Sequence, residues 1–176
     1  TAGILQEIYE SQGDYPKLVG VLEILAESAE DVETRTAYLR KIARVASDSL
    51  NDPAKAIDAQ ARALKQDPAN ADTRTELEQL AAQAEAWDQL DKIFSEIAEG
   101  LSDAELAREY WMRLAAIDER LGKVEEAAKG YERVLAIDPA DGDALAAMDA
   151  LYRRTERWED LLKVFRKRIE ERRRLL

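Results

Sequence analysis

Apolar residues recur every three or four positions through most of the chain, which is the spacing of an amphipathic α-helix. In one such stretch Leu90, Ile93, Phe94 and Ile97 fall on a single face, with polar residues between them. Ten stretches of this kind can be distinguished, separated by joints of two to six residues. Joints this short make successive helices antiparallel neighbours, so the pattern predicts an all-α protein built from helical hairpins.

Residues at the joints support these helix boundaries. Asp52 followed by Pro53 is typical of a helix start, because the side chain can accept a backbone hydrogen bond and proline has no N–H to leave unpaired. Ser102 and Glu105 have the spacing of a capping box, which predicts a helix beginning at residue 103. Three further helix caps are predicted at Asp14, Asp31 and Asn70.

The chain contains an internal repeat with a period of 71 residues. Residues 56–73 correspond to residues 127–144, and both segments carry Asp-Pro-Ala at the same place. The register continues without a gap through Trp87, which corresponds to Trp158, and on to Phe94, which corresponds to Phe165. A fixed period of this length indicates an array of stacked supersecondary units.

Residues 105–139 resemble a tetratricopeptide repeat. Residues 36–68 resemble this family less closely, since Leu39 replaces the tryptophan and Gln60 replaces the second aromatic residue. The pairs at 70–100 and 141–176 are more divergent still. The positions that carry the resemblance are Trp111, Leu114, Ala115, Gly122, Ala127, Tyr131, Val134 and Asp138-Pro139.

The resemblance implies a right-handed α-solenoid of about five antiparallel hairpins. We expect one array over residues 1–176, and we expect it to be a fragment of a longer array. The hairpins are expected at about residues 1–30, 31–67, 69–100, 102–138 and 141–176.

Helix packing accounts for several residues that could otherwise suggest ligand sites. Trp87, Trp111 and Trp158 have aliphatic neighbours three and four residues away, so we expect them to be buried between helices. Small residues are expected where helices cross closely, at Ala43, Ala56, Ala115 and Ala127.

The amino-acid composition excludes most kinds of catalytic site. The chain has no histidine and no cysteine, which excludes the usual nucleophile–base triads, thiolate chemistry and most zinc sites. Its glycines are scattered singly, so no phosphate-binding loop is present. We therefore expect no enzymatic activity, no cofactor and no metal ion.

The net charge of −11 disfavours nucleic acid as a partner, because binding to phosphates requires an excess of lysine and arginine. No apolar run approaches the length of a membrane span, and we expect a soluble, cytoplasmic protein. From residue 166 to residue 174 the chain has six basic and two acidic residues. This basic end could dock on an acidic surface or anionic lipid, or be a solvated helix end that suits the helix dipole.

The family resemblance implies that the first helix of each hairpin lines a concave face where partner peptides bind. Arginine side chains on those helices favour an acidic peptide or a C-terminal carboxylate, since a guanidinium group pairs with a carboxylate through two hydrogen bonds. The candidate contacts are Arg40, Lys41, Arg44, Gln79, Met112, Arg113, Arg120 and Arg153.

Two alternatives remain open at this point. The basic side chains could pair with acidic neighbours such as Glu76 or Glu119 and bind nothing. The chain could instead be an assembly or self-association segment that stacks through its end hairpins. Apolar residues that could form such end faces are Tyr9, Leu18 and Leu25 at one end and Leu175 and Leu176 at the other.

Overall fold

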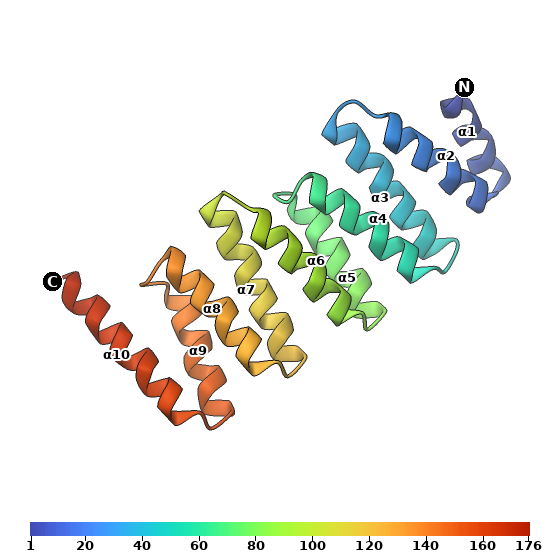
Figure 1. Cartoon of the computed structure of the whole chain (residues 1–176). Coiled ribbons are helices and arrows are strands. Elements are labelled where there is room, and N and C mark those ends of the chain that lie inside the picture. Colours follow the sequence, from blue (N-terminus) through green and yellow to red (C-terminus); the bar gives the residue numbers. More distant parts are fainter. The chain divides into compact units, whose positions relative to one another are not determined.

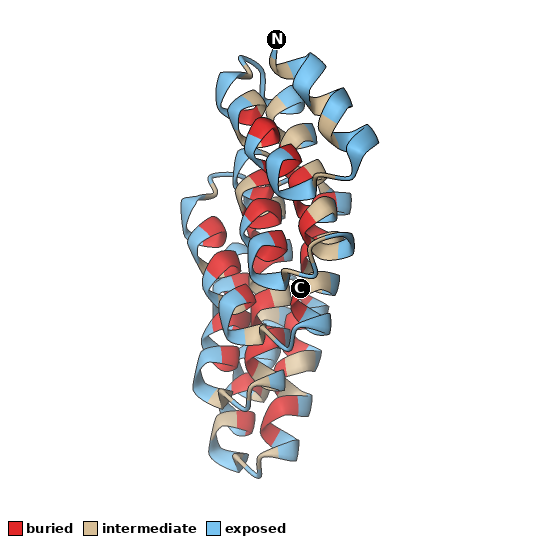
Figure 2. Ribbon diagram, turned by 90° about the vertical axis from the view of Figure 1, so that its right-hand side faces the viewer, coloured by how far each residue is buried: buried red, intermediate tan, exposed pale blue.

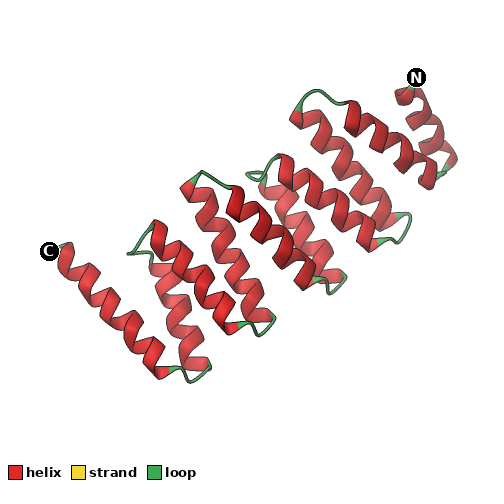
Figure 3. Ribbon diagram, in the orientation of Figure 1, coloured by secondary structure: helices red, strands yellow, loops and turns green.

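The computed structural model describes residues 1–176 and contains ten α-helices and no strand (Figures 1 and 3). This confirms the all-α architecture predicted from the hydrophobic periodicity. The helices are α1 (Ala2–Gln12), α2 (Tyr15–Ser28), α3 (Val32–Asp48), α4 (Pro53–Gln66), α5 (Ala71–Gln83), α6 (Trp87–Gly100), α7 (Ala104–Arg120), α8 (Val124–Ile137), α9 (Gly142–Arg154) and α10 (Trp158–Arg174).

Acidic or amide side chains cap six of the helix starts. At α4, the carboxylate of Asp52 accepts a hydrogen bond from the backbone N–H of Lys55 at 3.0 Å, and Pro53 occupies the first turn as predicted. Each cap pairs one N–H that the first helical turn leaves without a partner. The other five capping residues are Asp14, Asp31, Asn70, Asp103 and Asp141.

The predicted capping box at the start of α7 is wrong. The helix begins at Ala104, and Asp103 is the cap, accepting a hydrogen bond from the backbone N–H of Leu106 at 2.8 Å. A carboxylate at this position is also attracted to the positive end of the helix dipole, which the neutral hydroxyl of Ser102 is not.

The chain divides into two compact units, residues 1–90 and residues 91–176, and the boundary falls within α6. In the first unit, α1 packs on α2, α2 on α3, α3 on α4 and α4 on α5. Buried residues lie on the helix faces that are turned toward neighbouring helices (Figure 2). The core of this unit is aliphatic and includes Leu18, Leu22, Leu39, Ile42, Ala43, Ala59 and Ala63.

The second unit is built in the same way, with α7 packed on α8, α8 on α9 and α9 on α10. Phe94 of α6 and Tyr110 of α7 are both fully buried and meet edge to face, with ring centroids 5.4 Å apart and planes at 80°. The remaining core includes Ala115, Ala127, Tyr131, Val134, Leu135, Leu145, Met148, Leu151 and Leu161.

Helices α7 and α8 cross so closely that one position requires glycine. A Cβ atom added at Gly130 would lie 2.9 Å from Cβ and 3.3 Å from Cα of Ala115. The backbone of a packed helix cannot move aside as a flexible side chain can, so a larger residue would push the two helices apart. Ala43, Ala56 and Ala127, which were predicted at close crossings, are likewise buried, and this supports their packing role.

Two burial predictions are wrong. Trp158 is 55% exposed, because its ring lies at the start of α10, outside the contact that Leu161 makes with the core. Leu18, predicted for an exposed end face, is buried in the core of the first unit. Trp87 and Trp111 are half-buried.

Gly130→Ala should lower the free energy of unfolding by about 1–3 kcal/mol, because the added methyl group overpacks the contact with Ala115. Gly20→Ala is the matched control, since Gly20 is exposed within α2 and nothing lies within 4 Å of its Cβ position. That change should stabilise the chain by about 0.5–1 kcal/mol, because alanine favours the helix. Urea denaturation followed by circular dichroism measures both, and equal stabilisation by the two substitutions would contradict the close crossing.

Phe94→Ala should lower the free energy of unfolding by about 3–5 kcal/mol, because it empties a fully buried site against Tyr110. Trp158→Ala removes a larger side chain from the same unit but should change that free energy by no more than about 0.5 kcal/mol, since the ring is mostly exposed. Similar losses from the two substitutions, measured by the same denaturation, would show that Trp158 has a structural contact on α10.

Candidate functional site

In the first unit, Arg40 of α3 is bonded to the carboxylate of Glu76 on α5. Arg40 donates to it twice, from Nη2 to Oε1 at 2.6 Å and from Nε to Oε2 at 3.3 Å. Gln60 of α4 donates to the same Oε2 at 2.8 Å and to the backbone carbonyl of Thr73 at 3.1 Å. Burial alone would raise the pKa of Glu76, but the hydrogen bonds from Arg40 and Gln60 outweigh it, and the pKa lies below its usual value.

A cavity of about 250 Å³ lies beside this cluster, and its walls include Arg44, Gln60, Glu76 and Gln79. Arg44 is exposed and forms no ion pair within the first unit, in contrast to Arg40. The structure therefore brings two predicted residues, Arg44 and Gln79, together at one cavity, with Arg40 held next to them. An exposed guanidinium group beside amide side chains can take up a carboxylate from solution.

Lys41 lies on a different side of α3. Its Nζ is 3.0 Å from a carboxylate oxygen of Glu10, so it connects α3 to α1. Exposed pairs of this kind contribute little to stability, and Lys41 remains accessible for another anionic partner.

The second unit does not bring its four predicted residues together at one site; they are Met112, Arg113, Arg120 and Arg153. Met112 is half-buried against the core, and Arg113 is half-buried on the same helix, while Arg120 is exposed in the last turn of α7. Arg153 of α9 pairs with Asp149 at 3.0 Å and lies over the ring of Phe165, 5.9 Å from its centroid. Neither the cavity between α6, α7 and α8 nor the cavity between α8, α9 and α10 is lined by any of the four.

Acidic side chains hold several basic groups of the second unit in place. Glu119 accepts hydrogen bonds from the hydroxyl of Tyr131 and from Nη2 of Arg154, the latter at 2.6 Å. Burial, followed by the contact with Glu119, raises the pKa of Tyr131. Arg108 pairs with Asp141 and Asp143 and so ties α7 to the start of α9. Glu119 was predicted only as one possible acidic neighbour of the basic side chains. The pairs of Arg108 were not predicted, because residues 33 and 35 positions apart meet only through the stacking of hairpins.

None of the ten helices combines the length and the apolar character that crossing a membrane requires. No group of three or more acidic side chains is placed to hold a metal ion.

The fold is similar to that of several solved helical-repeat structures. A crystal structure of MamA aligns with a TM-score of 0.52 and 17% sequence identity, over 97% of this chain and 95% of that one. A crystal structure of BtubC (BKLC) from P. vanneervenii aligns with a TM-score of 0.51 and 19% identity, over 99% and 79% of the two chains. A tetratricopeptide repeat protein from Parabacteroides merdae gives a TM-score of 0.51 and 19% identity, over 77% and 52%. At these identities the likeness shows the fold alone.

Sequence comparison identifies the family. No curated protein matches the chain. One family model described as a tetratricopeptide repeat matches residues 108–141, and a second model with the same description matches residues 1–36 and 144–176. Together the matches cover more than half of the chain, including its best-conforming hairpin and both of its divergent end hairpins. The chain thus belongs to the tetratricopeptide repeat family.

Proposed function

We propose that the chain is a protein-interaction scaffold that binds a peptide or protein segment through the exposed side chains of its hairpin-first helices, on the concave face of the array. Membership of the tetratricopeptide repeat family supports a protein-binding role in general. The observation that supports a specific site is the exposed, unpaired guanidinium group of Arg44 at a cavity shared with Gln79.

An acidic segment or a C-terminal carboxylate is the partner that this cavity suits. Arg44 supplies the charge, and its fork of donors matches both oxygens of a carboxylate. Gln79 lines the same cavity, and its amide group can pair with the backbone of an extended peptide, whereas Gln60 already donates its amide group to Glu76 and Thr73. Arg40 has a supporting role in this proposal, because both of its donor groups already hold Glu76 in position.

In the second unit, Arg113, Arg120 and Arg153 are the basic residues of the corresponding helices that a partner could contact there. Arg153 would exchange an exposed pair with Asp149 for a pair with the partner. Such an exchange costs little, because the Arg153–Asp149 pair is solvated and contributes little to stability.

A second candidate function is assembly through the faces of the end helices. On α10, Trp158, Leu162 and Ile169 fall on one helix face and are 55%, 55% and 53% exposed. On α1, Ile4 and Leu5 are 62% and 41% exposed. A row of exposed apolar residues on a repeat protein is buried when another hairpin stacks on it.

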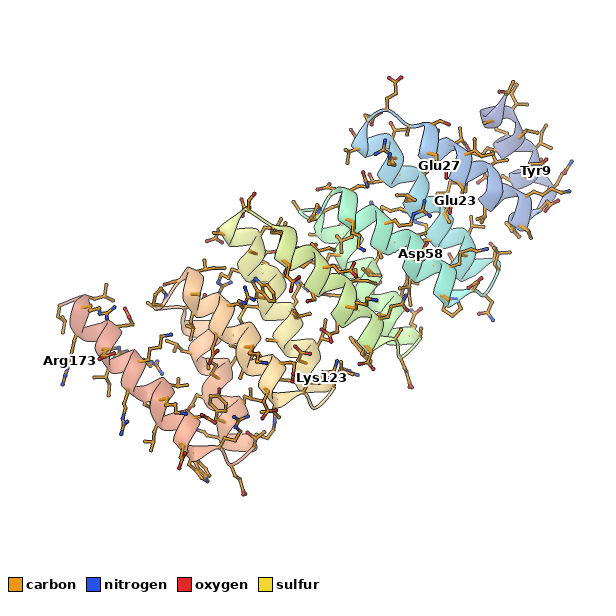
Figure 4. All side chains as sticks on the ribbon, in the orientation of Figure 1. Tyr9, Glu23, Glu27, Asp58, Lys123 and Arg173 are labelled. Atoms are coloured by element: carbon orange, nitrogen blue, oxygen red, sulfur yellow. The ribbon has the colours of Figure 1, made fainter.

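Arg44→Glu should weaken binding of a fluorescein-labelled hexaglutamate peptide by at least about tenfold, as measured by fluorescence anisotropy. Binding to the wild-type chain should also weaken as salt rises, since the Debye length shortens from about 10 Å at 0.1 M to about 3 Å at 1 M. Arg173→Glu, in the exposed basic end of α10, is the control for net charge (Figure 4). An equal loss of binding in this control would exclude the α3–α5 cavity as the site.

Leu162→Glu tests the assembly function. If copies associate through α10, the mass measured by sedimentation equilibrium should rise with the concentration of the wild-type chain and remain that of a monomer in the variant. A wild-type chain that stays monomeric at all concentrations would rule out self-association through this face.

A further inference from the structure

The second unit has a groove of about 550 Å³ enclosed by α6, α7 and α8, separate from the proposed peptide-binding side chains. Trp111, Leu114 and Asp118 contribute to it from successive turns of α7 and therefore share one face of that helix. Gly130 of α8 forms part of the wall and adds no side chain. The groove thus has an apolar floor formed by Trp111 and Leu114, and Asp118 is one of the five carboxylates that line it.

Asp118 is 4% exposed, and its Oδ1 has no hydrogen-bond partner. Burying a carboxylate oxygen without a partner is unfavourable, because the oxygen loses its hydration and gains nothing in return. Burial, and then the charge of Asp91, raises the pKa of Asp118 to about 6, although the charge of Lys123, which is bonded to Asp91 at 2.8 Å, acts in the opposite direction. The groove therefore contains a buried carboxylate oxygen that has no hydrogen-bond partner and whose charge is only partly compensated.

The other copy of the repeat shows that the fold does not require this carboxylate. Helix α3 matches α7 at an offset of 72 residues, one more than the period of the later segments, so that Leu39 corresponds to Trp111. At this offset the position of Asp118 is occupied by Ala46, which is fully buried. Alanine fills this buried position and has no polar side-chain group that needs a hydrogen-bond partner. The carboxylate is thus particular to the second unit.

The corresponding groove of the first unit, about 350 Å³ between α2, α3 and α4, has the opposite charge. Arg35, Arg62 and Lys65 line it with a single carboxylate, that of Glu27. Arg62 donates hydrogen bonds to both carboxylate oxygens of Glu23, at 3.0 and 2.9 Å. Five carboxylates and two basic residues line the groove of the second unit. The acidic character is therefore not a general consequence of the repeat.

We propose that the groove between α6, α7 and α8 receives a lysine side chain of a partner protein, with its ammonium group at Oδ1 of Asp118 and its aliphatic stem along Leu114. The stem would lie beside Trp111, whose ring is covered on one face by the guanidinium group of Arg133, 5.1 Å from the ring centroid. One unpartnered oxygen offers a single acceptor, which suits a compact ammonium group better than the two-pronged guanidinium group of arginine. The lining carboxylates do not form a group that could hold a metal ion, which favours an organic cation. This site is independent of the acidic peptide proposed for Arg44.

The test uses Nα-acetyl-lysine methylamide as the probe and follows the indole N–H of Trp111 in ¹⁵N–¹H spectra of the whole chain. The wild-type chain should give a saturable shift at millimolar probe, and the Nε-acetylated probe, which has the same stem without the charge, should give none. Asp118→Asn should weaken binding by at least about tenfold, because it keeps the shape and removes the charge. Glu27→Gln, which removes one negative charge from the other groove, should leave binding unchanged.

Asp118→Ala provides a second readout. Because it places alanine where the other copy has Ala46, it should raise the melting temperature while abolishing the shift. The proposal is overturned if the wild-type chain gives no saturable shift, if the Nε-acetylated probe binds equally well, or if Asp118→Asn retains full affinity. A lower melting temperature in Asp118→Ala would also overturn it, since the carboxylate would then be required by the fold.

Discussion

The close crossing of the two helices of a hairpin is the contact on which the rest of the structure depends. At α7 and α8 the approach is limited by Gly130 against Ala115, and in the first unit the matching positions are Ala59 and Ala43, both buried. Because small residues occupy these points, larger aliphatic side chains on either side can interdigitate and exclude water. The spacing of the hairpins, and hence the width of the grooves between them, follows from this contact.

The helix faces that pack on neighbouring helices stabilise the fold, and the other faces are available for function. Residues that face the partner helix are apolar or small, and the chain can vary the remaining positions without loss of the fold. Asp118 and Ala46 illustrate this at equivalent buried positions, as do the oppositely charged grooves of the two units. Within one repeat architecture, we propose that specificity comes from a few side chains such as Arg44 and Asp118.

Hydrophobic periodicity, caps and the internal repeat were sufficient to predict the ten helices, because each depends on residues within about four positions of one another. The same local rules failed at Ser102, where a neighbouring carboxylate is the better cap. They failed at Trp158 as well, since burial depends on which surface covers a residue and not on its spacing. Charged contacts such as Arg40 with Glu76 join residues 36 positions apart, so the sequence could offer them only as alternatives.

We propose that a carboxylate-bearing peptide binds at the cavity between α3 and α5. Titration of ¹⁵N-labelled chain with hexaglutamate tests this most directly, because the side-chain amides of Gln60 and Gln79 both line that cavity. We expect saturable chemical-shift changes of these two amides, together with changes in the backbone signals around Arg44 on α3. Shifts confined to the basic end of α10, or shifts that grow without saturation across the whole surface, would contradict it.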